Sequence, residues 1–385
     1  MKTPWPPPDP EFSQWLIGIR RAIHRWPELA FQETRTQELI CRELSKLAIP
    51  FRTHRTGVIA RLGPTEGEGV ALRADMDALP IAENTGLPFS SENSGVMHAC
   101  GHDGHVAMLL GAAALLREES LPGPVILIFQ PAEEGGAGAE TMITAGALAQ
   151  VRMIFAGHID RHFQAGEIAV QPGLICAFTD EFTITIEGKG GHAAKPHETT
   201  DIIVVASLLV MSIQTLVSRE TNPVFPSVVT VGRIRGGTAP NVIAHRAVLE
   251  GTIRTTMPQA RQKIISGLQR MVAAMEELYS AAATIDLEPG YPAVINEPGA
   301  SGLARQAAEL LVGTAGVKEQ GHPSLGGEDF AFYLNRVPGC LVRLGASPGP
   351  GAAPAHSPQF DFDEAVLPLG AAFLAQAALL GLAQP

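Results

Sequence analysis

The sequence has little of several features that mark particular protein classes. It contains four cysteines in 385 residues, at irregular spacing, so no disulfide framework is indicated. Acidic residues outnumber basic ones to give a formal net charge of −11, and no basic stripe is visible, which argues against a nucleic-acid partner. The most apolar run, Ile202 to Val217, is interrupted by polar residues and is shorter than the roughly 20 residues that a bilayer-spanning helix needs. We therefore expect neither a nucleic-acid nor a membrane partner.

The N-terminal residues M-K-T-P-W-P-P-P-D-P lack the apolar segment of a signal peptide, so we expect a cytoplasmic protein. Hydrophobic residues make up 45% of the chain and charged residues 17%, which is ordinary globular composition. The length allows two domains with a sizeable core.

The first part of the chain alternates short apolar runs with helical patterns, as in an α/β fold. The runs are almost continuously apolar, as expected of strands that are buried on both faces. Polar groups follow three of them: Asp75, the pair Glu133 and Glu134, and His158. In open α/β sheets, ligands bind beyond the carboxyl ends of the strands, so we expect these groups to converge. The three runs span residues 70–73, 125–129 and 151–156.

From about Asp180 the pattern changes. Residues 181–187 alternate between apolar and polar, which indicates a strand with one wet face. The elements that follow predict the order β-α-β-β-α-β, a ferredoxin-like arrangement. The expected fold class is therefore α/β: a mixed-sheet catalytic domain, residues 1–179 and 290–385, with an inserted ferredoxin-like lid domain, residues 180–289. The expected elements after the first strand are a helix at 200–219, strands at 227–234 and 247–255, a helix at 258–278 and a strand at 283–287.

The densest group of reactive side chains is V-M-H-A-C-G-H-D-G-H, residues 96–105. Cysteine and histidine suit a borderline-soft divalent ion, and a carboxylate can complete its coordination. Two such ions can share a bridging ligand and a water, and a free carboxylate beside a metal-bound one can deprotonate that water. Singly each residue is weak evidence, because a lone histidine is more often structural and a lone cysteine is most often a small buried apolar group.

Eight motifs together resemble one family: A-L-R-A-D-M-D-A-L-P, G-V-M-H-A-C-G-H-D-G-H, I-F-Q-P-A-E-E, G-K-G-G-H-A-A-K-P-H, G-G-T-A-P-N-V-I, G-T-I-R, G-G-E-D-F and A-H-S-P. It is the amidohydrolase branch of the aminoacylase/carboxypeptidase G dinuclear metallopeptidases. This branch includes hippurate hydrolases, N-acetyl-diaminopimelate deacetylases and plant auxin–amino-acid conjugate hydrolases. The resemblance runs from about Arg21 to Glu364, nearly the whole chain.

The resemblance implies a site that holds two divalent metal ions per chain, with Mn or Zn preferred and Co or Ni acceptable. Its implied metal ligands are Cys100, His102, Glu134, His158 and His356. Cys100 would bridge the ions as a thiolate, and Glu133 would be the general base that deprotonates a metal-bridged water. Asp75 would lie behind the ligands and orient one of them.

The resemblance also implies roles for residues of the inserted domain. His192 would donate to the developing oxyanion. Asn241 and Arg254 would contact the carboxylate of the substrate. By contrast, His98 and His105, which flank the core motif, are expected to be structural.

The leading hypothesis is a metal-dependent amidohydrolase that cleaves N-acyl amino acids into a carboxylic acid and a free amino acid. The acyl group is open, with hippurate-like, acetyl and related conjugates all in range. One alternative is a cysteine hydrolase with Cys100 as nucleophile, paired with His102 or His105. A second alternative is a catalytically silent homologue that binds metal or ligand.

The expected long helix of the inserted domain is apolar nearly all round, so it must be covered on more than one side. We therefore expect a homodimer through the lid domain, since a two-fold pairing is the commonest solution. Glycine and proline near Asp180 and Gly290 suggest hinges that swing His192 over the metals. Whether His192 serves its own or the partner's site stays open.

Overall fold

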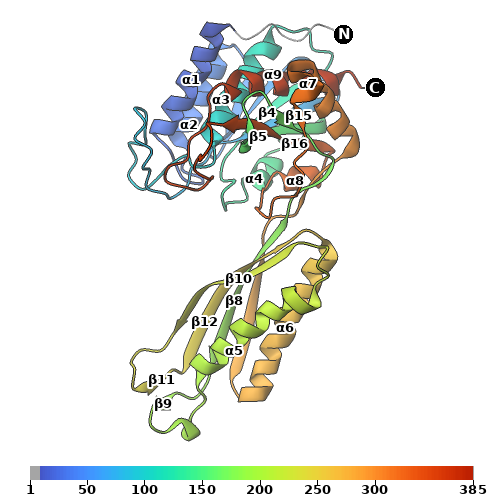
Figure 1. Cartoon of the computed structure of the whole chain (residues 1–385). Helices are drawn as coiled ribbons and strands as arrows, with labels where there is room; N and C mark the ends of the chain where they lie inside the picture. Colours follow the sequence, from blue (N-terminus) through green and yellow to red (C-terminus); the bar gives the residue numbers. More distant parts are fainter. Residues whose placement is uncertain (1–8, 385) are drawn as a thin grey trace. The chain divides into compact units, whose positions relative to one another are not determined.

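The structure, a computed structural model, describes residues 9–384, which fold as two compact units (Figure 1). Of the described residues, the larger unit comprises 9–175, 295–322 and 329–384, and the smaller unit comprises Cys176–Val294 and Pro323–Glu328. The segment Pro323–Glu328 was expected in the larger unit, because the predicted boundaries assigned all of residues 290–385 to it. It groups with the smaller unit because the N–H of Ala177 donates to the carbonyl of Ser324 at 2.9 Å.

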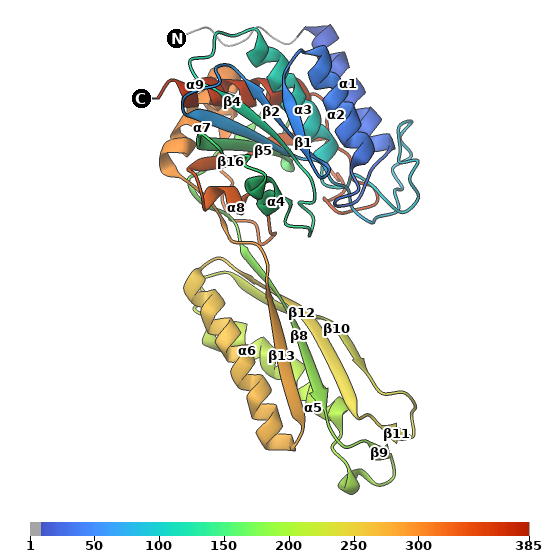
Figure 2. The same cartoon turned by 180° about the vertical axis from the view of Figure 1, so that it is seen from behind.

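The larger unit contains a mixed sheet with the strand order β1-β2-β4-β3-β5-β16-β6-β15 (Figure 2). Strand β3 runs parallel to β4 and β5, and β5 parallel to β16, whereas β2 joins antiparallel to β4. The expected mixed α/β class is thus confirmed. The strands are β1 (Phe51–His54), β2 (Gly57–Leu62), β3 (Gly69–Asp75), β4 (Val125–Gln130), β5 (Val151–Gln164), β6 (Ile168–Ala169), β15 (Val317–Lys318) and β16 (Gly339–Ser347).

Strand β5 is longer than its apolar pattern predicted, and this changes the place of His158. The sequence puts His158 just past a strand that ends at Ala156, whereas the structure puts it inside β5. The pairing of β5 with β3 stops at Ala156, opposite Arg73, but pairing with β16 continues and sets His158 opposite Arg343. His158 therefore lies two residues beyond the last residue of β5 that pairs with β3.

Helix α3 (His102–Arg117) lies at the centre of the larger unit and is buried along most of its length. It packs on β3 and between α1 (Pro10–Arg25) and α9 (Val366–Leu382). The helices approach closely at Gly111, where a Cβ atom would lie 2.7 Å from Cβ of Ala371. The other helices of this unit are α2 (Thr34–Lys46), α4 (Gly138–Thr144), α7 (Pro298–Gly316) and α8 (Ala331–Leu334).

The smaller unit has the expected order β-α-β-β-α-β, with a sheet order of β10-β12-β8-β13. Helices α5 and α6 pack on this sheet, and the alternation of the first strand places Phe182, Ile184 and Ile186 in their shared core. The elements are β8 (Phe178–Glu187), α5 (Ile202–Thr215, continued by a π turn at Leu216–Glu220), β10 (Ser227–Gly236), β12 (Arg246–Thr255), α6 (Pro258–Tyr279) and β13 (Ala282–Pro289).

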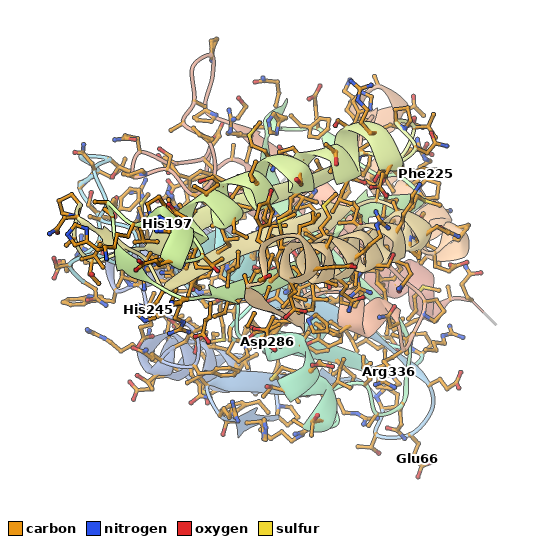
Figure 3. The ribbon with its side chains drawn as sticks, turned by 90° about the horizontal axis from the view of Figure 1, so that it is seen from below. Glu66, His197, Phe225, His245, Asp286 and Arg336 are labelled. Carbon is orange, nitrogen blue, oxygen red and sulfur yellow. The ribbon has the colours of Figure 1, made fainter. Side chains whose placement is uncertain are left out.

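Short strands complete the smaller unit and its connections. β9 (Gly191–His192) pairs with β11 (Val242–Ile243) at the end of the unit opposite to the one where the chain enters and leaves (Figures 1 and 2). A 3₁₀ turn, Pro196–Glu198, follows β9. On the connecting segments, β7 (Gly173–Cys176) pairs with β14 (Val294–Asn296). Figure 3 shows His197 and His245 at one end of the smaller unit and Phe225 at the other.

Within residues 9–384, one helix passes the length and composition test for a membrane span: Ile202–Glu220. The core helix of a water-soluble domain passes the same test, and here Ile202, Val205 and Leu209 are buried against the sheet of the smaller unit. The test is therefore weak evidence for a span.

A buried ionic network fixes α1 against the start of α3. Arg20, 1% exposed, donates from Nε to Asp103 at 3.0 Å, and its guanidinium lies over the ring of Phe362 at 4.2 Å. The other guanidinium nitrogens reach Asp361 and Glu364 near the C-terminal helix. Because a buried charge without its partner is strongly destabilising, this network locks three distant segments together.

His24 belongs to the same network. Its Nδ1 lies 2.8 Å from Asp103 and its Nε2 3.3 Å from Glu83. Burial alone would favour the neutral imidazole, but the hydrogen bonds to these two carboxylates outweigh it and raise the pKa of His24 to about 9. His24 is therefore charged at neutral pH.

This shift predicts how stability depends on pH. A raised histidine pKa stabilises the fold fully below pH 6.5, and the effect is lost as pH rises through about 9. The shift corresponds to on the order of 3 kcal/mol. The Tm difference between the wild-type protein and His24→Gln, measured by calorimetry, should thus be largest near pH 6 and shrink by pH 9.5. A difference that stays constant over this range would contradict the charged His24.

Candidate metal centre

The remote sequence motifs meet in the larger unit. Two groups of ligand atoms, each within 4.8 Å of one another, are Cys100 with His102 and His158, and Cys100 with Glu134 and His356. A third group joins His102 and Glu134 to Glu133. The five predicted ligands and the predicted base thus form one cluster, and Cys100 is common to its two cysteine-containing groups.

A tight turn presents the cysteine and the first histidine. Gly101, between them, has φ of 91° and a Cβ there would lie 3.3 Å from Ile159, so glycine suits this position both in conformation and in space. His356, on the last loop, also has a left-handed backbone with φ of 64°. Its N–H donates to the carbonyl of Ala99 at 2.8 Å, which ties the loop to the cysteine segment.

Two of the histidines are oriented by backbone carbonyls. Nδ1 of His102 lies 2.9 Å from the carbonyl of Asp77, and Nδ1 of His158 lies 2.7 Å from that of Ile159. Each carbonyl can only accept, so Nδ1 carries a proton toward it, and Nε2 is the ring atom that is left to ligate a metal. Nε2 of His158 is 3.6 Å from Sγ of Cys100.

Nε2 of His102 is buried and has no hydrogen-bond partner among the described residues 9–384. An unsatisfied buried polar atom is costly in a folded protein, and a divalent ion would satisfy it. The donor set of one thiol, three imidazoles and a carboxylate matches the same chemistry. The residues present therefore fit a metal centre.

The second ligand group shows how the ligands interact with each other. Nε2 of His356 lies 3.1 Å from Oε1 of Glu134. Hydrogen bonds with Cys100, the larger effect, and with Glu134 raise the pKa of His356 to about 10. A proton is thus held where a metal ion would otherwise balance the negative charge.

Asp75 and His105 form a support behind the ligands. Oδ1 of Asp75 accepts from Nδ1 of His105 at 2.5 Å, and Nε2 of His105 accepts the N–H of Ile159 at 2.9 Å. The His105 ring lies 4.7 Å from that of His158 and is stacked 5.4 Å from that of His102. His105 thus lies beside the rings of two predicted ligands, as its spacing of three residues from His102 on one helix indicates.

Asp77 holds the backbone of the two glutamates, a role that the sequence did not reveal. Its Oδ1 accepts the N–H of Glu133 at 3.0 Å and its Oδ2 accepts that of Glu134 at 2.9 Å. Asp77 is buried, as is Glu133, whose carboxylate accepts the N–H of Asp329 at 3.4 Å. One carboxylate thus fixes the turn that carries the predicted base and its neighbouring ligand.

The predicted residues of the smaller unit lie at opposite ends of it. His192 is exposed on β9, and the carbonyl of Asn241 accepts the N–H of Ala193 at 3.1 Å, so these two residues are neighbours. Arg254 is at the other end of the sheet, where its Nη1 donates to the carbonyl of Leu325 at 3.3 Å. A single chain therefore does not bring Asn241 and Arg254 to one substrate carboxylate within this unit.

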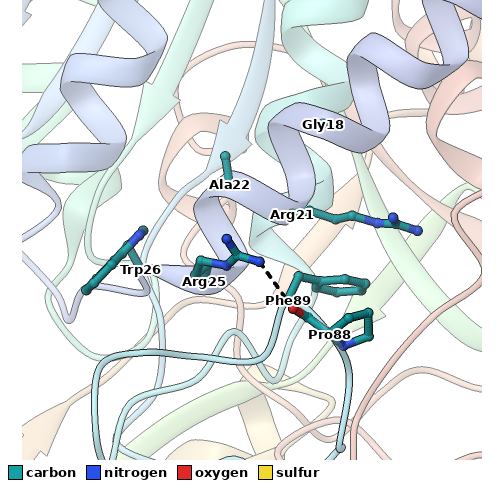
Figure 4. Close-up of a pocket in the computed structure, with 7 residues that line it drawn as sticks. All are labelled: Gly18, Arg21, Ala22, Arg25, Trp26, Pro88 and Phe89. Atoms are coloured by element: carbon teal, nitrogen blue, oxygen red, sulfur yellow. Dashed lines mark hydrogen bonds between the residues drawn. The ribbon is translucent and has the colours of Figure 1, made fainter.

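A surface pocket of about 400 Å³ lies outside the metal cluster, between the end of α1 and the Pro88 loop (Figure 4). Its two arginines are already engaged. Arg21 pairs with Glu364 at 2.6 Å, and Arg25 donates to the carbonyl of Pro88 at 3.1 Å. These contacts mark the pocket as a packing feature.

The mixed sheet, the inserted unit and a partly buried Cys/His/Glu cluster together define a metallohydrolase. Residues 71–380 match the model of peptidase family M20/M25/M40, and the chain belongs to this family. This confirms the expected family and the expectation of a hydrolase.

Relatives of known type support the same class. The chain is 42% identical to N-acetyl-L-cysteine deacetylase of Bacillus subtilis over 94% of its length and 87% of the relative. It is 40% identical to IAA-amino acid hydrolase ILR1-like 5 of Arabidopsis thaliana over 96% of this chain and 87% of the relative. A dinuclear metal-binding peptidase of the M20 family from Bacillus subtilis superposes with a TM-score of 0.86 at 36% identity, covering 98% of this chain and 100% of that one.

The cluster predicts metal content. Purified protein should bind about two divalent ions per chain, and a chelator should remove both the ions and the hydrolytic activity. Adding a divalent ion back should restore activity, and Cys100→Ser should bind less metal because it weakens a ligand that both groups share. Elemental analysis that finds no metal in an active preparation would contradict this assignment.

Proposed function

We propose that the chain is a dinuclear metal-dependent amidohydrolase that cleaves N-acyl amino acids into a carboxylic acid and a free amino acid. The observation that carries this proposal is the cluster in which Cys100 is shared by two ligand groups beside the additional, buried carboxylate of Glu133. The names of the relatives, a deacetylase of an acetylated amino acid and a hydrolase of amino-acid conjugates, support this substrate class. Acetyl and hippurate-like acyl groups are the first candidates.

Cys100, His102, Glu134, His158 and His356 hold the two ions in this proposal. Mn and Zn both suit a set that mixes thiolate, imidazole and carboxylate, and Co and Ni are acceptable to it. When bound, the ions supply the Lewis acidity that polarises the scissile carbonyl and lowers the pKa of the attacking water.

Glu133 acts as the general base. It is buried at a turn whose backbone Asp77 holds, and its carboxylate lies within 4.8 Å of the ligand atoms of His102 and Glu134. From there it takes the proton of the attacking water and passes it to the leaving amine. A cysteine nucleophile would leave Glu133, Glu134 and His356 without a role, which favours the metal mechanism.

Substitution of each glutamate separates the base from the ligand. Glu133→Gln should keep both ions and lower kcat by at least about 100-fold, because it removes the proton acceptor but keeps the shape. Glu134→Gln should instead lower metal content. The measurements are elemental analysis and steady-state kinetics on an N-acetyl amino acid, and a near-normal kcat in Glu133→Gln would rule this base out.

The position of His192 within the smaller unit supports a role in the partner's site. Strand β8 has 10 residues, so β9 beyond its far end is about 30 Å from the connections to the larger unit. The N–H of Asp329, at one of these connections, contacts the Glu133 carboxylate at 3.4 Å. A hinge at these connections leaves His192 about 30 Å from them, which favours the partner's site for this residue.

The partner in this proposal is a second copy that pairs through the smaller unit. One side of α5 is buried on the sheet, but the other side exposes Ile203, Val204, Leu208 and Met211, the last of which is 70% exposed. Val228 and Ile234 on the edge strand β10 are exposed too. An apolar stripe beside an unpaired strand edge suits an interface that a two-fold axis repeats.

Mixing two inactive variants tests whether His192 acts across subunits. His192→Ala should lower kcat by about 100-fold or more with unchanged metal content, because one oxyanion donor is lost. When it is re-paired with Glu133→Gln, mixed dimers contain one complete site, so about one quarter of the wild-type activity should return. Light scattering should give the mass of two chains.

Each contrary outcome removes a separate part of the proposal. No recovery on mixing would place His192 in its own chain's site, and an intact kcat in His192→Ala would remove it from the mechanism. A monomeric mass would remove the interface.

A further inference from the structure

A second buried carboxylate, besides Asp77, reaches the turn that carries the proposed base. Glu33 precedes α2 and has no exposed surface. Its Oε1 accepts the N–H of Ala132 at 2.9 Å, and its Oε2 accepts the hydroxyl of Thr56 at 2.6 Å. Ala132 is the residue directly before Glu133 and lies 99 positions away from Glu33 in the chain.

Glu33 sits where a side chain usually caps its own helix, but its carboxylate points elsewhere. The second and third N–H groups of α2, at Arg35 and Thr36, donate to Glu28 at 3.0 Å each. With Glu28 as the cap, the Glu33 carboxylate serves the turn before Glu133.

The turn needs such an anchor because Ala132 has a left-handed backbone, with φ of 56°. This conformation is unfavourable for alanine and persists only where the surroundings hold it. The carbonyl of Ala132 accepts the N–H groups of Gly136 at 3.2 Å and Gly138 at 3.1 Å, and its own N–H is the one held by Glu33. Both peptide groups that flank its Cα are therefore fixed.

Three consecutive N–H groups thus donate to two carboxylates: that of Ala132 to Glu33, and those of Glu133 and Glu134 to Asp77. The direction of each Cα–Cβ bond follows from the backbone, so this clamp sets where the two glutamate side chains point. We propose that Glu33 is a positioning residue that holds Ala132 in its left-handed conformation and thereby aims the Glu133 carboxylate. This inference rests on the proposed role of Glu133 as base.

A purely space-filling role would not call for an acid at this position. Burial disfavours the ionised carboxyl and raises the pKa of Glu33 to about 7, although the hydrogen bond from Thr56 opposes the shift. Nearby core positions on α2 are filled by Leu39 and Ile40, which carry no such cost. Both oxygens of Glu33 are spent on directed hydrogen bonds, as a positioning group requires.

Three variants separate positioning from support of the fold. Glu33→Leu removes the acceptor for the Ala132 N–H at similar volume, whereas Glu33→Gln keeps an amide oxygen that can accept it. Thr56→Val is the matched control, because it removes the other hydrogen bond of the same carboxylate and leaves the turn's acceptor in place. If Glu33→Leu does not fold, Glu33→Asp replaces it, since its carboxylate is one bond too short to reach both partners.

The readouts are kcat and KM on an N-acetyl amino acid, metal content, Tm, the visible spectrum of the Co-loaded protein and the crystal structure of the variant. We expect Glu33→Leu to lower kcat about 10- to 100-fold with KM and ion number little changed. Ala132 should leave φ near 56°, and the Co spectrum should shift as Glu134 moves. Glu33→Gln should restore kcat to within about threefold of wild type, and Thr56→Val should lower Tm but not kcat.

A folded, metal-loaded Glu33→Leu or Glu33→Asp protein with wild-type kcat and an unmoved turn would overturn the inference. Equal losses of kcat and Tm in Glu33→Leu and Thr56→Val would also overturn it, since they would show general destabilisation. Failure of the proposed function is a different result, namely a wild-type protein that is metal-loaded but hydrolyses no N-acyl amino acid. In that case the backbone shift at Ala132 and the Co spectrum still decide the role of Glu33.

Discussion

The metal centre depends on the hydrogen bonds that hold peptide groups and imidazoles behind it. Carbonyls of Asp77 and Ile159 fix the rings of His102 and His158 so that Nε2 of each ring is left for an ion. The Asp77 carboxylate then fixes the backbone of Glu133 and Glu134. The orientation of these two rings and of the turn that carries the glutamates is therefore set by contacts within the fold itself.

The two compact units divide the work between them. The larger unit holds the ligand cluster, near the point where the chain returns from the smaller unit at Asp329. The smaller unit carries His192 at the far end of its sheet and leaves an apolar side of α5 exposed. The proposed homodimer accounts for both observations. Pairing of two chains would cover the apolar side of α5, and it would supply His192 of each chain to the site of the other.

Local patterns predicted a large part of this structure, and long-range contacts account for what they missed. The apolar runs at β3 and β4 and the alternation in β8 indicated the strands, because burial on two faces or one leaves a distinct period. The predicted length of β5 was too short, because β5 is extended by its pairing with β16, a segment nearly 200 residues later in the chain. Asp77 and Glu33 gave no local signal, since the N–H groups that they hold lie 56 to 99 residues away in the chain.

Two ions sharing Cys100 is the claim on which the rest depends, and anomalous diffraction from crystals of the metal-loaded protein tests it most directly. The account predicts two peaks about 3.5–4 Å apart, with the Cys100 sulfur between them and His102 and His158 on one side, Glu134 and His356 on the other. A single peak, or two peaks of which neither contacts Cys100, would contradict it.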